Sequence, residues 1–415
     1  AWAFGQPYGS DAADPDTVIA KMYTELGDPP ALATADFLYL PAIDALFCLL
    51  HVEATRLQNE GKPFEAMETM FRCLMLARQI ADREFLTEKL VGMTNMYNAL
   101  TRLRDIAYVD SRAETPKLTA ENIRDILRRL RDDRAALTVE RIRLPRGDNL
   151  AAEQIISRVY DPRGGPNAER FAPTLARIAS RGRPMRMFSE SAKWDALRPL
   201  SGNDLAAREA LGNVFNDWAK RWDLEWNDPI LKLTPDYQKL DKTRFAMIDM
   251  VVGDVGRLFP VRRSIVTEVI CTRTALAMYG QFLQHRAYPR DIAAVRPVFL
   301  QKIDWDPWDQ NKPPKLTLDF FVPMRDRPGG PNEPPKPHEI EVFPDLPAPT
   351  AVRWPSFSVR LRDDTFVMYS TGPDGQRNGM RKATGMVEDE KGDYLAWPPV
   401  LSLLRQNLVE SGRLK

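Results

Sequence analysis

The stretch ATRLQNEGKPFEAMETMFRCLMLA, residues 54–77, divides at Gly61 into two helical patterns. A glycine commonly ends one helix, and a proline in the first turn commonly opens the next. Small side chains recur on both sides of this turn, where two packed helices must approach closely: Ala54, Ala66, Cys73 and Ala77. The stretch therefore predicts an antiparallel helical hairpin.

Helical patterns extend outward from this hairpin, from about residue 13 to residue 285. Apolar residues at helical spacing predict helices over 42–59, 63–80 and 85–109. Thr119 and Asn203 are typical helix caps, and the helix after Asn203 is expected to end near Trp226. Strand-like patterns are almost absent before residue 315, so this part of the chain predicts a bundle of helical hairpins.

The composition changes in the last third of the chain. Between Pro289 and Pro355 lie 15 of the 34 prolines, a density that forbids long helices. The Pro-rich stretch at about 324–350 is expected to form a long surface insertion. Short β-favouring runs and a closing helix are expected at 315–322, 356–361, 365–370 and 400–409. The sequence thus predicts a helical domain, 1–260, and a smaller α+β module, 261–415.

Charge and composition exclude several classes of protein. The 415 residues carry 58 basic and 57 acidic side chains, a formal net charge of +1. This near-neutral charge argues against a protein that binds nucleic acid or an anionic membrane with its whole surface. No stretch approaches the roughly 18 consecutive apolar residues of a membrane-spanning helix. Three cysteines and three histidines match no metal or disulfide framework. The first residue is Ala1 rather than methionine, as in a chain that was either processed or trimmed, and a removed signal or anchor would leave such an end.

One region is strongly basic. Residues 141–186 hold ten arginines, no lysine and four carboxylates. Arg181, Arg183 and Arg186 surround a glycine and a proline, so they are expected on an exposed loop that could meet phosphate, lipid headgroups or an acidic protein. Few aromatic residues are interleaved with them, which weakens the case for nucleic acid. A solvated loop or a protein contact is the favoured interpretation.

Two further clusters allow functional and structural interpretations. Trp218, Trp222 and Trp226 share one face of a helix, where they could stack on a ligand or, as we favour, pack into the core. Acidic residues at 304, 306 and 309 could serve acid–base chemistry or form a structural turn. The sequence offers no catalytic constellation that favours an enzyme.

The C-terminal motifs follow a recognisable order. A long helix over 263–284 precedes Tyr288-Pro289, a short helix, the turn Asp306-Pro307-Trp308, and later the loop 369–375, YSTGPDG. This order resembles the periplasmic part of the major pseudopilin of type II secretion systems. It is similar to the ending of uncharacterised planctomycete-type helical proteins. The resemblance covers about residues 265–395 and implies a long helix packed on a short antiparallel sheet.

The same resemblance implies a calcium site after the YSTGPDG turn. Asp374 would be the anchoring ligand, and Asn378, Asp389 and Asp393 could complete an oxygen shell. Three cations crowd this loop, at positions 377, 381 and 382, and positive charge weakens a calcium site. A turn without metal is therefore the alternative, and the favoured one. Pseudopilins polymerise through a very hydrophobic N-terminal helix, and nothing like it precedes residue 262.

Residues 54–77 also resemble a single tetratricopeptide unit, without a second copy at a 34-residue period. A peptide-binding groove is one implication, and a plain helical hairpin is the other. We therefore expect a structural or protein-interaction subunit of an envelope or secretion-related assembly, in the periplasm or cell envelope. Its partners would be proteins, in a larger complex or a homo-oligomer, with no nucleic acid and with membrane contact only through a removed anchor or a partner. The alternative is an enzyme or ligand-binding protein with a pocket between the two parts, lined by the tryptophan face and the acidic cluster.

Overall fold

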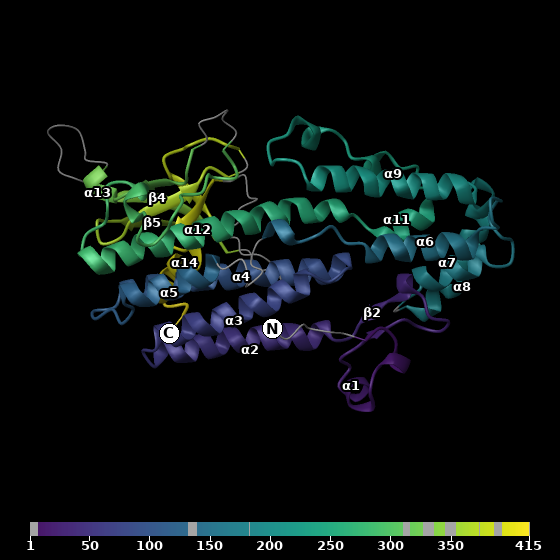
Figure 1. Cartoon of the computed structure of the whole chain (residues 1–415), viewed down its shortest axis with the longest axis horizontal. Helices are drawn as coiled ribbons and strands as arrows, with labels where there is room; N and C mark the ends of the chain where they lie inside the picture. The colour runs from purple at the N-terminus through teal and green to yellow at the C-terminus, as the bar shows by residue number, and fades with distance from the viewer. Residues whose placement is uncertain are drawn as a thin grey trace. The chain divides into compact units, whose positions relative to one another are not determined.

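The computed structural model describes residues 7–131, 139–181, 183–309, 316–326, 336–344, 354–372, 374–385 and 392–414. The fold is mainly helical, with a six-stranded sheet and a closing helix near the C-terminus, as the sequence predicts (Figure 1). The chain forms two compact units. Unit 1 comprises Ala1–Leu46, Gln79–Gly92 and Ile142–Phe259, and unit 2 comprises Phe47–Arg78, Met93–Arg141 and Pro260–Lys415. A division near residue 260 stays a prediction.

The predicted hairpin is present, and the stretch 54–77 lies in unit 2. The hairpin joins α2 (Leu40–Asn59) to α3 (Pro63–Ala81), and α4 (Leu86–Ser111) follows. Gly61 lies in the turn with φ of +72°, a conformation that side chains rarely adopt, so glycine is needed there. The small residues of the hairpin are all fully buried, which allows the close approach that the sequence indicated: Ala54, Ala66, Cys73 and Ala77.

Unit 1 is built around α6 (Gly147–Val159), which contacts α9 (Asp204–Trp222) and α11 (Ala246–Val252). The helices α7 (Phe171–Ala179) and α8 (Met187–Leu197) pack extensively on each other. Unit 1 also contains short elements, among them α1 (Pro15–Ile19), α10 (Asp236–Lys239), and the paired strands β1 (Thr24–Glu25) and β2 (Asp36–Phe37).

Helix α9 begins as predicted but ends earlier. The Asn203 side chain accepts a hydrogen bond from the amide of Ala206 and caps the helix. The helix stops at Trp222, so Trp226 does not share its face, contrary to the prediction. Arg221, in the last turn, donates to the carbonyls of Ile230 and Leu233, and these bonds hold the returning chain against the helix end.

Unit 2 carries the sheet, whose strand order is β3-β6-β8-β7-β4-β5. The predicted antiparallel sheet is wrong in part, because β7 runs parallel to both β4 and β8. Strand direction depends on long connections that local pattern does not reveal. The strands are β3 (Asp319–Phe321), β4 (His338–Phe343), β5 (Phe357–Leu361), β6 (Val367–Ser370), β7 (Lys382–Thr384) and β8 (Asp393–Trp397).

Strand β4 lies inside the stretch at 324–350 that was expected to be a surface insertion. Prolines Pro337 and Pro344 flank the strand, but none interrupts its six residues, so the ladder with β5 and β7 can form. The average composition of the stretch concealed this short proline-free run.

Helices pack against the sheet within unit 2 (Figure 1). The ring of Tyr279, on α12 (Leu258–His285), stacks on that of Trp397 in β8, with centroids 6.1 Å apart. Val400 and Leu403 of α14 (Val400–Glu410) join the buried core of the sheet. The other helices of this unit are α5 (Ala120–Arg131), capped by Thr119 as predicted, and α13 (Pro323–Asp326). Within the described residues, no helix combines the length and hydropathy required to cross a bilayer.

Candidate interaction site

The three arginines predicted to form an exposed loop lie between α7 and α8. Arg181 follows α7, and Arg183 and Arg186 precede α8; all three are exposed. Arg181 forms an ion pair with Asp36 at 3.0 Å. Their exposure is confirmed, and their role in an interaction stays a prediction.

The residues proposed for calcium occupy different environments. Asp374 and Asn378 are exposed, and the Asp374 carboxylate accepts a hydrogen bond from the amide of Gln376. Asp393, in β8, is fully buried, and burial, together with the charges of Asp374 and Asp319, raises its pKa to about 7. Asp389 lies outside the described residues. Nowhere in the described part of the chain do three or more histidine, cysteine, aspartate or glutamate side chains form a group suited to a metal ion.

The calcium hypothesis makes a measurable prediction about Asp393. A bound cation would favour the ionised carboxylate, so calcium should raise the melting temperature of the wild-type chain, and EDTA should reverse the rise. Asp393→Asn should abolish this response, whereas Asp125→Asn, on α5, should preserve it. A melting temperature that is indifferent to calcium in all three proteins would contradict the hypothesis and leave the turn without metal.

The tryptophan cluster and the acidic cluster both make contacts within their own units. Trp218 and Trp222 are buried in unit 1, where Trp218 packs on Phe215 and the Trp222 indole donates to the carbonyl of Ile142 at 3.0 Å. This confirms the packing interpretation for those two rings. In unit 2, Asp304 pairs with Arg273 at 3.1 Å.

The Asp306 carboxylate is buried and holds a turn together. It accepts hydrogen bonds from the amide of Trp308, from the hydroxyl of Ser370, and from both the amide and the hydroxyl of Thr371. The Trp308 indole in turn donates to Thr267 on α12 at 3.1 Å. The turn 306–308 therefore links α12 to the end of β6, which supports its structural interpretation.

A buried ion pair crosses the interior of unit 2, and sequence analysis did not identify it. Arg104 on α4 lies 2.5 Å from Glu268 on α12, with side chains 1% and 0% exposed. Arg104 also donates to the Tyr394 hydroxyl and to the carbonyl of Ala396, both at 2.7 Å. Burial raises the pKa of Glu268 to about 7, although the charge of Arg104 acts in the opposite direction. The partners lie 164 positions apart in the sequence, so no local spacing could reveal them.

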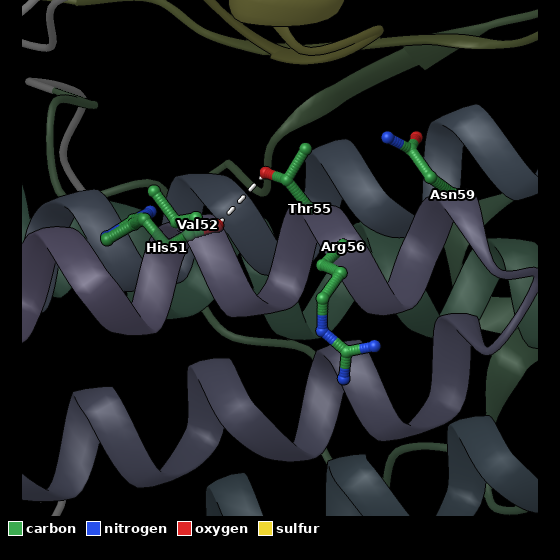
Figure 2. A pocket seen from close by; sticks show the side chains of 5 residues that line it. All are labelled: His51, Val52, Thr55, Arg56 and Asn59. Carbon is green, nitrogen blue, oxygen red and sulfur yellow. Dashed lines mark hydrogen bonds between the residues drawn. The ribbon is translucent and has the colours of Figure 1, made fainter.

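A groove of about 460 Å³ lies on the outer face of α2. Figure 2 shows its lining side chains, with Thr55 and Asn59 along one side of the helix and Arg56 projecting from the other. Val52 is 65% exposed, and Leu49, one turn before it, is 64% exposed. The groove is lined by His51, Val52, Thr55, Arg56 and Asn59.

The polar groups of the groove are largely satisfied within the chain. The Thr55 hydroxyl donates to the carbonyl of His51 at 2.9 Å (Figure 2). It also accepts a hydrogen bond from Arg102 on α4. Arg56 pairs with Glu53 at 2.7 Å and with Glu60, which balances its charge. Burial, and secondarily the charge of Arg102, lowers the pKa of His51 to about 4, so the imidazole is neutral at pH 7.

The groove thus presents one exposed apolar side chain, Val52, between polar residues, and the charge of Arg56 in its lining is already balanced by carboxylates. The groove was not predicted, because the apolar residues of α2 indicate a helix but not which of them the rest of unit 2 covers. The resemblance of 54–77 to a tetratricopeptide unit was the available signal, since it implied a peptide-binding groove.

Comparison of the chain with protein-family models, with curated proteins and with solved structures gives no match.

Proposed function

We propose that this protein is a protein-interaction subunit that holds a partner segment on the outer face of α2. The observation that carries the proposal is the groove, with the exposed Val52 in its lining and the exposed Leu49 one helical turn before it. A partner segment that places an apolar side chain over Val52 would remove both side chains from water. Asn59, exposed at the end of the groove, offers an amide donor and an acceptor to the partner backbone.

The chemistry of the groove favours a peptide over a charged metabolite. The guanidinium of Arg56 is already paired with two carboxylates, and His51 is neutral, so neither provides a free charge for an anion. A volume of about 460 Å³ accommodates a few side chains of a helix or extended segment. The envelope or secretion-related assembly remains part of this proposal and rests on the resemblance of residues 265–395.

A substitution at the centre of the groove tests the proposal. Val52→Asp places a charge where an apolar contact is expected, and should weaken partner binding at least about 30-fold, as loss of an interface hot spot does. The matched control is Val409→Asp, at a valine on α14 that is 52% exposed. Light scattering of protein purified from its native source gives the mass of the assembly for each variant.

A photo-crosslinker at position 49 identifies what occupies the groove. The wild-type background should yield a defined crosslinked partner, or a second copy of this chain, and Val52→Asp should remove it. The proposal fails if the wild-type protein has the mass of a single chain and crosslinks to nothing. It also fails if Val409→Asp disrupts the assembly as strongly as Val52→Asp.

A further inference from the structure

The turn between α7 and α8 projects large apolar side chains among arginines. Met185 is 88% exposed and Phe188 is 86% exposed. Arg183 and Arg186 are exposed beside them, so cationic and apolar groups alternate within six residues. The basic composition of 141–186 indicated the arginines, whereas the exposure of Met185 and Phe188 is visible only in the folded chain.

The electrostatic balance of this turn is positive. From 177 to 198 the chain carries six basic residues and two acidic ones. Asp36 neutralises Arg181. Arg183 and Arg186 form no ion pair with any residue that the structure describes.

Most side chains of helix α8 are exposed to solvent. Trp194 is its one buried residue, and Phe188, Ala192 and Ala196 lie four positions apart on an exposed face. A phenylalanine left almost wholly in water forgoes the stabilisation that burial provides. An exposed apolar group of this kind commonly marks a contact with another surface.

We infer that this turn binds the surface of an anionic lipid bilayer. Met185 and Phe188 enter the boundary between headgroups and acyl chains, and Arg183 and Arg186 contact lipid phosphates. Arg183 and Arg186, which form no ion pair within the described residues, complement the charge of an anionic bilayer, and beside them project the apolar side chains of Met185 and Phe188. These two apolar side chains are sufficient for reversible membrane contact when the cations act with them. This inference goes beyond the proposed protein interaction at α2 and does not depend on it.

Vesicle co-sedimentation of the full chain tests the inference. Wild-type protein should bind vesicles that contain phosphatidylglycerol, bind pure phosphatidylcholine vesicles weakly, and lose affinity as salt is added. Arg183→Gln with Arg186→Gln should lower the partition coefficient about 30-fold, since each arginine contributes about fivefold. Met185→Ser with Phe188→Ser should lower it at least about tenfold.

Matched controls separate this turn from the rest of the surface. Ile19, which is 80% exposed, and Arg128, whose side chain is 76% exposed, carry the same kinds of group elsewhere. Ile19→Ser with Arg128→Gln should bind vesicles as the wild type does. The inference is overturned if wild-type protein does not bind anionic vesicles, or if the control variant loses as much affinity as the others. It is also overturned if Met185→Ser with Phe188→Ser dissociates an assembly in the absence of lipid, because the turn would then be a protein interface.

Discussion

Replacing Arg104 with methionine should lower the free energy of unfolding at pH 8 by about 3–5 kcal/mol. The substitution leaves the carboxylate of Glu268 buried without its cation and removes the donors to Tyr394 and Ala396. Chemical denaturation followed by circular dichroism measures the loss. Hydrogen exchange in α4, α12 and β8 locates it in unit 2.

The loss should shrink as the pH falls. Because the folded-state pKa of Glu268 is raised above its ordinary value of 4.5, the folded protein binds a proton more readily than the unfolded chain between about pH 4.5 and 7. Without Arg104 the raised pKa moves further upward, so protonation removes the unpaired charge and relieves the penalty in mildly acidic solution. The difference between wild type and Arg104→Met should therefore be smaller at pH 5 than at pH 8.

Two control variants test whether the unpaired charge of Glu268 causes the loss of stability in Arg104→Met. Arg104→Met combined with Glu268→Leu should be more stable at pH 8 than Arg104→Met alone, since it leaves no buried charge. Arg128→Met breaks an exposed pair with Asp125 and should cost less than about 1 kcal/mol. A double variant less stable than the single one would show that packing, rather than the unpaired charge, dominates.

Replacing Asp306 with alanine should destabilise unit 2 by about 2–4 kcal/mol. Four hydrogen bonds from Trp308, Ser370 and Thr371 end on this one buried carboxylate, and alanine leaves their donors without an acceptor. Asp306→Asn keeps one acceptor oxygen and should cost less. Denaturation gives the total loss, and the exchange rate of the Thr371 amide reports whether the turn itself has opened.

Asp304 supplies the comparison within the same segment. It pairs with Arg273 at 3.1 Å, and its side chain is 27% exposed, so Asp304→Ala should cost no more than about 1 kcal/mol. Equal losses from the two alanine variants would contradict the assigned role of Asp306. The contrast distinguishes a carboxylate that organises a turn from one that forms an ordinary partly exposed ion pair.

Much of the fold follows from the local sequence. Gly61, the caps at Thr119 and Asn203, and the apolar spacing of α2 to α4 are features that act within one or two helical turns. They predicted the corresponding helices because helix formation is governed by neighbouring residues. The packing of Trp218 and Trp222 also followed from their spacing. Trp226 does not share their face, because the helix ends at Trp222 and the chain turns back, with Arg221 donating to the carbonyls of Ile230 and Leu233.

The candidate sites depended on contacts between distant residues. Arg104 and Glu268 meet only through the packing of α4 on α12, and β4 finds β7 across more than thirty intervening residues. The groove on α2 and the exposed Phe188 exist because other elements leave those apolar side chains uncovered. The sequence by itself determined where helices form and which residues are apolar. Only the tertiary structure decided which of those residues are covered, because burial depends on the surface that a distant segment brings to each side chain.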